Sequence, residues 1–413
     1  MTSVRALPRY SYLLFVLLCI ATSFEGFDTN LSTLLLPKLG DEFGAAPDTL
    51  GFILSLIGFG TMASFFVVRL ADRYGRKPVI VASIAGYGVL TLATYFSNSL
   101  WQFAALQFGA RMLMVTQLAV AYVMLSEELP ADLRGRANGL LGAAGSAGAA
   151  MPALFLAPLA ASSWGWRALF LLGSLPLLLV PLFVTKVRET RAFEARRASA
   201  SDADFFGQAR LLFGPALRRR TVAMSAVWFI INFWSAAVAF FFYYYVMSER
   251  SWVDADLQLV APAALPFAFA GYMIAGWLMD AIGRRRAAIV YLVLGAAVAM
   301  TCYQATGWWT IAACWVSLQT LMGVWVVGTT LTAELFPTEV RAAASGLTLS
   351  LIGRLGFVLA PSVTGVLAVW LDSTGSAVSL LALVNLLAIP ILVFAIPETR
   401  GVDLAAPSKA PPV

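Results

Sequence analysis

The sequence of 413 residues contains no histidine and only three cysteines. The absence of histidine excludes acid–base catalysis by imidazole and metal ligation by imidazole. Cys19, Cys302 and Cys314 lie singly in apolar runs without CxxC spacing, which argues against a disulfide framework and against a zinc site. We therefore expect neither a metal site nor a cofactor.

Charge is also scarce. Charged residues make up 12% of the chain, whereas hydrophobic residues make up 60%. An average soluble domain is about 25% charged and roughly 45–50% apolar. A soluble protein of the present composition would expose an insoluble surface, so the composition indicates a polytopic membrane protein. Nucleic-acid binding would need a soluble basic domain, and we expect none.

Long apolar runs predict the fold class. A membrane-spanning helix needs about 20 mostly apolar residues, and the alternating pattern of a membrane β-barrel is absent. The first span carries Glu25 and Asp28 and is long for a signal peptide, so we expect it to be retained. The sequence predicts an all-α fold of twelve transmembrane helices, which cover residues 10–38, 48–68, 78–97, 101–128, 137–160, 166–186, 221–247, 257–279, 287–305, 308–334, 342–371 and 375–396.

One long polar stretch divides the spans into two sets of six. We predict an N-terminal six-helix bundle at 1–186, a cytoplasmic linker at 187–220, and a C-terminal six-helix bundle with a short cytoplasmic tail at 221–413. Most of the 28 Lys and Arg residues lie in the linker, in the two tails and in alternate loops. Because basic loops remain on the cytoplasmic side, we expect both termini in the cytoplasm and the protein in the inner (plasma) membrane.

Two charged motifs occur once in each half. Residues 70–77, LADRYGRK, follow the second span, and residues 278–285, LMDAIGRR, follow the eighth. An offset of about 207 residues relates the copies, which indicates an internal repeat of a six-helix unit. The second motif has Glu127 followed by Arg134 at the end of the fourth span, and it is repeated as Glu334 followed by Arg341 at the end of the tenth.

These motifs resemble those of the major facilitator superfamily of secondary transporters, and LADRYGRK is similar to its loop 2–3 signature. The resemblance covers essentially the whole chain and implies two six-helix bundles. Val68 stands where members usually have Gly. Residues 397–401, PETRG, resemble the ending of sugar porters and related metabolite porters.

We predict that the motif charges form ion-pair networks that hold a cytoplasmic gate shut. The alternative is that these charges only set the topology. The motif residues are Asp72, Arg73, Gly75, Arg76, Lys77, Glu127, Arg134, Asp280, Gly283, Arg284, Glu334 and Arg341.

Four charged residues fall inside the predicted spans: Glu25, Asp28, Arg111 and Arg354. Such a charge costs about 3 kcal/mol or more unless it is paired or hydrated. Asp28 and Arg111 share a depth about 5 Å to the outer side of the membrane centre at 1.5 Å per residue, so we hypothesise that they interact directly or through substrate. The repeat does not duplicate these charges, which favours substrate chemistry over a buried ion-pair staple.

Two local motifs carry a narrower resemblance. Residues 24–28, FEGFD, are similar to the D-G-[FY]-D signature of the aromatic-acid/proton symporters, with Glu25 in place of the first Asp. Residues 353–361 resemble the G-R-x-G…P segment of those symporters and of animal organic-anion transporters, where the Arg serves anionic substrates. A guanidinium fits a carboxylate with two parallel hydrogen bonds. We assign Glu25 as the principal proton carrier, Asp28 as its coupling partner, and Arg111 and Arg354 as counterparts of the substrate charge.

Polar and aromatic residues complete the candidate substrate site. Asn232 and Gln319 are polar residues in spans expected to line the cavity. Trp234 and Trp325 have rings on which a ring-bearing substrate could stack, although aromatic residues are also ordinary in membrane cores and interfaces. The fifth span has three glycines, expected to allow close helix packing, at Gly142, Gly145 and Gly148.

The sequence thus predicts a monomeric, proton-coupled symporter that imports a small organic anion, such as an aromatic or sugar acid, by alternating access. Its expected partners are a carboxylate substrate, protons and the lipid bilayer. A neutral-sugar porter and a drug/proton exporter are alternatives within transport, although two buried Arg disfavour a neutral sugar. A membrane sensor or receptor is the alternative outside transport. We expect no enzyme, because no nucleophile–base–orienter set can be assembled without His and no phosphate-binding Gly loop is present.

Overall fold

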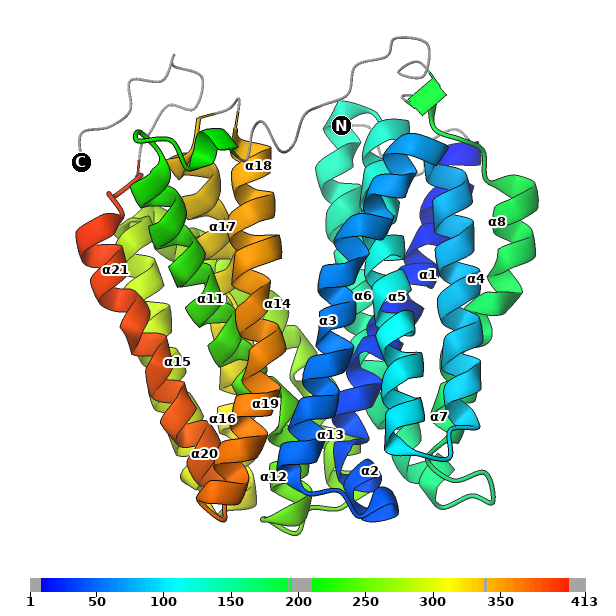
Figure 1. Ribbon diagram of the computed structural model, residues 1–413, viewed down its shortest axis with the longest axis vertical. Helices are drawn as coiled ribbons and strands as arrows, with labels where there is room; N and C mark the ends of the chain where they lie inside the picture. The colour runs from blue at the N-terminus through cyan, green and yellow to red at the C-terminus, as the bar shows by residue number, and fades with distance from the viewer. Residues whose placement is uncertain (1–8, 192, 195–209, 338–339, 401–413) are drawn as a thin grey trace. The chain divides into compact units, whose positions relative to one another are not determined.

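The computed structural model describes residues 9–191, 193–194, 210–337 and 340–400. These residues are almost entirely helical and include no β-strand (Figure 1). Twelve helical segments within them are long and apolar enough to cross a membrane. The predicted all-α class with twelve spans is therefore confirmed. Residues 195–209 of the predicted linker and the tail after Arg400 lie outside the described residues.

The first six spans follow the predicted order. The sixth span, Ala168–Lys186, is assembled from three short consecutive helices. The elements are α1 (Arg9–Leu34), α2 (Leu36–Phe43), α3 (Pro47–Tyr74), α4 (Arg76–Tyr95), α5 (Leu100–Glu128), α6 (Ala131–Ala160), α7 (Ala168–Gly173), the 3-10 helix η2 (Leu175–Leu179) and α8 (Val180–Lys186).

The second six spans are interrupted more often than the first. The elements are α11 (Arg218–Phe240), α12 (Phe242–Ser248), α13 (Asp254–Ala263), α14 (Leu265–Ile282), α15 (Arg284–Gln304), α16 (Trp308–Leu321), α17 (Val324–Leu335), α18 (Arg341–Ser345), the π-helix η3 (Gly346–Gly353), α19 (Arg354–Trp370), α20 (Thr374–Ala382), the 3-10 helix η4 (Leu383–Leu387) and α21 (Ala388–Ala395).

Two predicted boundaries need correction. The first span was expected to reach residue 38, but α1 ends at Leu34 and a separate helix, α2, follows. The repeated charged motifs were expected in loops, but α3 continues to Tyr74 and α14 to Ile282. The chain turns only at Gly75 and Gly283, whose φ angles of 108° and 96° lie in the region that glycine adopts most readily.

The eleventh span contains a π-helical segment immediately before Arg354. This segment, η3, ends at Gly353, where α19 begins. Close packing accompanies it, because a Cβ atom at Gly356 would come within 2.1 Å of the carbonyl oxygen of Phe229 on α11. π-helical turns are rare and are found mostly at functional sites.

The helices group into two compact units. Unit 1 contains α1, α2, α4 to α8 and the part of α3 from Leu56, together with Val253–Pro262. Unit 2 contains α11, α12 and the helices from α14 onward, together with Gly44–Ser55. Each unit thus includes a short segment from the other half of the sequence, and the division of the chain at residues 187–220 stays a prediction.

Glycines bring α1 and α6 of unit 1 into close contact. A Cβ atom at Gly26 would come within 1.9 Å of the carbonyl oxygen of Gly145, and one at Gly148 would come within 1.8 Å of that of Ser23. The predicted packing role of Gly145 and Gly148 is confirmed. Gly26 belongs to the FEGFD motif, so this motif also fixes the distance between the two helices.

Candidate functional site

Arg76 joins three helices at one end of unit 1. Its side chain is 3% exposed. Nη2 lies 3.2 Å from Asp72 Oδ1 on α3 and 3.2 Å from Glu127 Oε1 on α5, and Nη1 donates to the carbonyl oxygen of Ala71 at 2.9 Å. Three of the predicted motif residues therefore form the expected ion-pair network.

Two residues after α8 complete this network and were missed in the sequence. Glu189 accepts hydrogen bonds from the backbone N–H groups of Arg76, at 2.9 Å, and Lys77, at 3.1 Å. Thr190 donates its hydroxyl to Glu127 Oε2 at 2.6 Å. A carboxylate at a helix N-terminus satisfies unpaired amides and interacts favourably with the helix dipole.

Unit 2 contains a matching network. Arg284 lies 3.2 Å from Asp280 and 3.1 Å from Glu334. Its backbone N–H donates to Glu398 Oε1 at 2.8 Å, and Thr399 donates to Glu334 Oε2 at 2.5 Å. Each network thus ties together helices of its own unit.

A third repeat could have revealed Glu189 and Thr190. Residues 188–191 read RETR and residues 397–400 read PETR, at nearly the spacing of the other motif copies.

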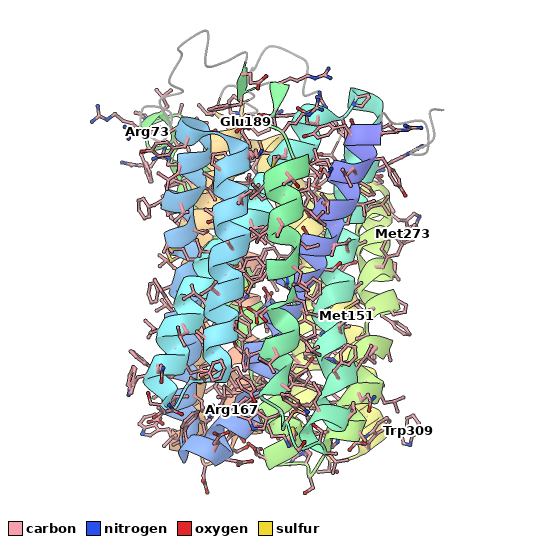
Figure 2. The ribbon with its side chains drawn as sticks, turned by 90° about the vertical axis from the view of Figure 1, so that its right-hand side faces the viewer. Arg73, Met151, Arg167, Glu189, Met273 and Trp309 are labelled. Carbon is pink, nitrogen blue, oxygen red and sulfur yellow. The ribbon has the colours of Figure 1, made fainter. Side chains whose placement is uncertain are left out.

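Figure 2 shows Glu189 and Arg73 at one end of the unit 1 helices and Arg167 at the opposite end. We call the end with Glu189 the motif end.

The other repeated arginines bind helix C-termini. Arg134 Nε donates to the carbonyl oxygen of Leu129, the C-cap of α5, at 2.9 Å. Arg341 Nε donates to that of Phe336, the C-cap of α17, at 3.4 Å. The two copies therefore repeat in structure as well as in sequence.

The side chains of two further motif residues, Arg73 and Lys77, lie outside the ion-pair networks. Arg73 is exposed and lies 5.4 Å above the ring of Tyr74. The Lys77 side chain donates to the carbonyl oxygen of Val184 at 2.9 Å. The structure thus places these two cations at the surface of the motif end rather than in ion pairs.

Three of the four intramembrane charges lie together in unit 1. Asp28 is fully buried, and its Oδ2 accepts a hydrogen bond from Thr91 at 2.8 Å. Glu25 is 8% exposed and accepts from the hydroxyl of Thr29 at 3.1 Å. Arg111 donates to the carbonyl oxygen of Thr29 at 2.9 Å and interacts electrostatically with both carboxylates. Among the described residues, Asp28 and Arg111 form no ion pair within 4 Å, although they interact electrostatically. The hypothesis that they interact through substrate stays a prediction.

Neutral polar residues extend this cluster away from the motif end. Ser32 donates to Gln107 Oε1 at 3.3 Å, and Gln107 donates to Thr94 Oγ1 at 3.1 Å. All three side chains are buried. They were missed in the sequence, although Thr91 and Thr94 lie three residues apart, and therefore on one face of an apolar helix.

The fourth charge, Arg354, lies against aromatic rings in unit 2. Its guanidinium carbon is 5.7 Å from the ring centroid of Trp325 and 5.3 Å from that of Phe357. The Trp325 ring lies 5.5 Å from that of Trp228, and its Nε1 donates to Ser235 at 3.3 Å. A cation over an aromatic face is attracted to the ring quadrupole. Arg354 and Trp325, predicted separately, are thus brought together, whereas Phe357 was missed.

The remaining predicted substrate residues have three different environments. Trp234 is 1% exposed and packs against Gly295 of α15 in the core of the unit, so it cannot stack on a substrate there. Asn232 is buried and donates to the carbonyl oxygen of Trp228 at 2.8 Å. Gln319 is partly exposed on α16, and its side chain has no hydrogen-bond partner among the described residues.

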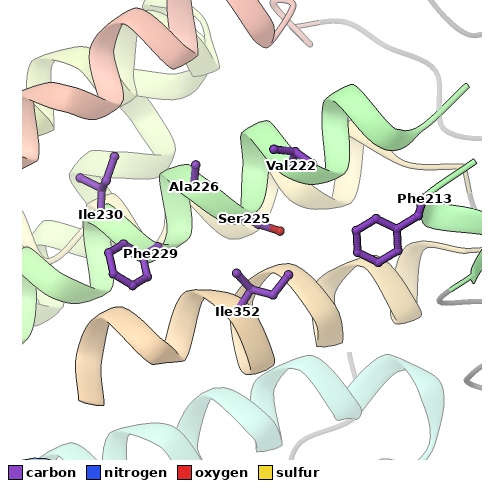
Figure 3. A pocket seen from close by; sticks show the side chains of 7 residues that line it. All are labelled: Phe213, Val222, Ser225, Ala226, Phe229, Ile230 and Ile352. Atoms are coloured by element: carbon purple, nitrogen blue, oxygen red, sulfur yellow. The ribbon is translucent and has the colours of Figure 1, made fainter. Parts of the chain in front are cut away.

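An apolar pocket of about 400 Å³ lies between α11 and η3 (Figure 3). It contains no charged side chain, so a carboxylate would lose its hydration there without gaining a partner. We therefore do not place the substrate in it. The pocket is lined by Phe213, Val222, Ser225, Ala226, Phe229, Ile230 and Ile352.

No group of three or more His, Cys, Asp or Glu residues within the described ranges could hold a metal ion.

The family model of the Major Facilitator Superfamily matches residues 18–253 and, in a second match, residues 229–412. The chain belongs to this superfamily. It is therefore a multi-pass membrane transporter and not an enzyme. The two matches cover nearly the whole chain, as the internal repeat predicts.

Individual members of the superfamily match over most of their length. The niacin transporter of Acinetobacter baylyi is 28% identical, over 96% of this chain and 96% of its own. The 4-hydroxybenzoate transporter of Pseudomonas aeruginosa is 28% identical, over 83% of each chain. The gentisate transporter of Corynebacterium glutamicum is 25% identical, over 84% of this chain and 79% of its own.

Solved structures of superfamily members share the fold. A bacterial homologue of the human lysosomal transporter Spinster matches with a TM-score of 0.79 and 13% identity, over 94% of this chain and 97% of its own. A D-xylose–proton symporter matches with a TM-score of 0.75 and 14% identity, over 95% of this chain and 99% of its own. At such low identity these likenesses establish the fold alone.

Proposed function

We propose that this transporter is a proton-coupled symporter that imports a small organic anion, in particular an aromatic carboxylate, by alternating access. The arrangement of Arg354 with Trp325 and Phe357 carries the proposal. A guanidinium can bind a carboxylate with two parallel hydrogen bonds, and the neighbouring rings can stack on the aromatic part of the same molecule. A neutral sugar would need amide and hydroxyl donors rather than this cation.

Proton coupling is assigned to the buried carboxylates of α1. Glu25 and Asp28 lie within one helical turn of each other and both interact with Arg111. A carboxylate in this position can be neutralised by a proton or by a cation, so the charge of a bound substrate anion and the protonation of these groups affect each other. We assign Glu25 as the principal proton carrier, Asp28 as its partner, and Arg111 as the cation that responds to the substrate.

The substrates named for the relatives favour an aromatic acid over a sugar acid. Niacin, gentisate and 4-hydroxybenzoate are ring compounds with a carboxylate, and these are the substrates in the names of three relatives. Identities of 25–28% do not transfer a particular substrate. They support the class, a carboxylate attached to a small aromatic ring.

The distribution of basic residues gives the proposed orientation. The motif end carries Arg73, Arg76 and Lys77, so we place it in the cytoplasm, together with both termini. In this orientation the two motif networks stabilise the cytoplasmic ends of the helices and regulate opening there. We further propose a monomer in the inner membrane with bundles at 1–186 and 221–413.

Transport in proteoliposomes under an imposed pH gradient tests the proposal. The wild type is expected to accumulate benzoates or nicotinate when the outside is acidic, and to leave neutral sugars behind. Glu25→Gln should abolish accumulation driven by the pH gradient while it keeps exchange of labelled for unlabelled substrate. Accumulation of neutral sugar without acid would overturn the anion assignment, and pH-driven accumulation by the Glu25→Gln protein would overturn the role of Glu25.

A further inference from the structure

Three buried side chains near Asp28 have polar atoms that lack a hydrogen-bond partner among the described residues. They are the hydroxyl of Thr22 on α1, the hydroxyl of Tyr87 on α4, and both amide atoms of Gln117 on α5. Each side chain is at most 1% exposed. Leaving such groups unpaired is costly, and buried polar atoms without a protein partner are commonly bonded to internal water.

Two hydrogen bonds fix the relative heights of the three helices. The bond from Thr91 to Asp28 places these residues at one level on α4 and α1. The bond from Gln107 to Thr94 does the same for α5 and α4. Helices α1 and α4 run in the same direction and α5 runs in the opposite one, so positions can be counted from these two bonds.

The three unpaired side chains lie at nearly one level. At a rise of 1.5 Å per residue, Thr22 lies about 3 Å and Gln117 about 4.5 Å beyond the Cα of Tyr87, both toward the motif end. Long side chains in helices lean toward the N-terminus of their own helix, and the N-terminus of α4 is at the motif end. The hydroxyl of Tyr87 is therefore directed to the level of Thr22 and Gln117.

At 1.5 Å per residue, Asp28 lies about 6–10 Å from this group along the helix axes, on the side away from the motif end. It has one oxygen available. Its Oδ1 has no hydrogen-bond partner in the described chain, whereas Oδ2 is bonded to Thr91. A Cβ atom at Gly173 of α7 would lie 3.4 Å from Oδ1 and 3.1 Å from Thr91 Cγ2, so the missing side chain lets α7 pack closely beside this oxygen. Tyr87 interacts electrostatically with both Asp28 and Glu25.

We propose that Thr22, Tyr87 and Gln117 bind a cluster of internal water molecules that connects Asp28 Oδ1 with the motif end. Each of the three side chains offers a donor and an acceptor, which matches water. The site is fully enclosed by protein, so it does not suit an aromatic anion. Its role as a proton path rests on the proton coupling proposed above.

The proton step balances without any other reactant. When the proton shared by the coupled carboxylates Glu25 and Asp28 resides on Asp28, it passes to the adjacent water, which leaves a carboxylate and a hydronium ion. The hydronium ion gives a proton to the oxygen of Tyr87 while the Tyr87 hydroxyl proton passes to the next water, so the tyrosine is regenerated. The other titratable groups facing the cluster are Cys19 and Glu25 on α1 and Arg111 and Tyr122 on α5. Residues 138–152 of α6 and 168–173 of α7 contain no charged residue.

Radiolytic hydroxyl-radical labelling of the wild type tests the water site directly. X-rays generate radicals from bound water, so a buried tyrosine beside ordered water is oxidised, whereas a dry one is protected. Tyr303 is the reference, because it is fully buried and its hydroxyl donates to the carbonyl oxygen of Val238. We expect Tyr87 to be labelled clearly faster than Tyr303. Equal protection of the two residues would overturn the proposal.

Transport by two nearly isosteric variants tests the proton role. Tyr87→Phe and Gln117→Leu should lower pH-driven accumulation by about tenfold or more, as expected for loss of a proton-transfer group. Their exchange of labelled for unlabelled substrate should remain within about twofold of wild type, which also shows that they fold. Tyr95→Phe, at the other end of α4, is the control and should change neither.

The outcomes separate this inference from the proposed function. Unchanged pH-driven accumulation in both variants, with a proton-coupled wild type, would overturn the proton path alone. A wild type that exchanges substrate but does not respond to a pH gradient would overturn the proposed proton coupling and the proton path with it. The labelling of Tyr87 would still decide whether the cluster binds water.

Discussion

The carboxylate of Glu189 lies so close to Gly75 that a Cβ atom at residue 75 would come within 2.2 Å of Oε2. The second copy repeats this relationship, because a Cβ atom at Gly283 would come within 2.7 Å of Glu398 Oε2. Each glycine immediately precedes a transmembrane helix, α4 or α15. The missing side chain thus lets a carboxylate reach the N-terminal amides of that helix, where the helix dipole also stabilises it.

Gly75→Ala should destabilise the protein. Alanine is disfavoured at a φ of 108°, by about 1 kcal/mol or more, and its methyl group would also displace Glu189. Gly44→Ala is a control for alanine in the milder left-handed region, since Gly44 has a φ of 60° and a Cβ atom there would have no other atom within 4 Å. Thermal unfolding in detergent should show a larger fall in Tm for Gly75→Ala. Equal losses in the two variants would contradict the added cost at residue 75, both from its φ of 108° and from the contact with Glu189.

Gly26→Ala should weaken the packing of α1 against α6. Its methyl group would lie 1.9 Å from the carbonyl oxygen of Gly145, so the helices must separate. Overpacking of this kind costs about 1–3 kcal/mol or more. Gly139→Ala, on the same α6 helix, adds a methyl with no atom within 4 Å and serves as the control. Comparison of Tm values would contradict the packing role if Gly26→Ala were as stable as Gly139→Ala.

The spans and the motif networks could be predicted because their signals are local or repeated. A run of apolar residues predicts a membrane helix whatever its neighbours are. The matching copies of the charged motifs predicted ion-pair networks, although the particular pairing of Arg76 with Glu127 was not specified. Glu189 was missed because the third repeat is only a few residues long, and its first copy stands at the edge of a polar stretch.

The orientation of side chains around each helix could not be predicted in the same way. Trp234 and Trp325 both appeared suitable for stacking, but Trp234 packs against Gly295 and Trp325 lies beside Arg354. The rotation of a helix about its axis depends on packing with neighbouring helices, which no single segment specifies. The same reason explains why Thr91, a neutral residue, was not recognised as the partner of Asp28.

Substitution of the two tryptophans should separate binding from stability. Trp325→Ala removes a ring beside Arg354 and should raise the KM for an aromatic acid by about tenfold, the equivalent of 1.4 kcal/mol, with a smaller change in Tm. Trp234→Ala creates a cavity in the core of unit 2 and should cost about 3–5 kcal/mol of stability. Uptake kinetics and thermal unfolding of both variants check this. A lower Tm without a higher KM for Trp325→Ala would assign Trp325 to packing.

The charge on Arg354 should determine which of two similar substrates is transported. Nicotinate and nicotinamide share a ring and differ in that only nicotinate carries a carboxylate, so the wild type should prefer nicotinate. Arg354→Lys keeps the positive charge but loses the two parallel hydrogen bonds of a guanidinium, and the KM for nicotinate should rise by about tenfold. Arg354→Gln removes the charge and should abolish the preference. Competition uptake measures the ratio of nicotinate uptake to nicotinamide uptake directly. A preference for nicotinate that persisted in Arg354→Gln would assign carboxylate recognition to another cation, and Arg111 is the next candidate.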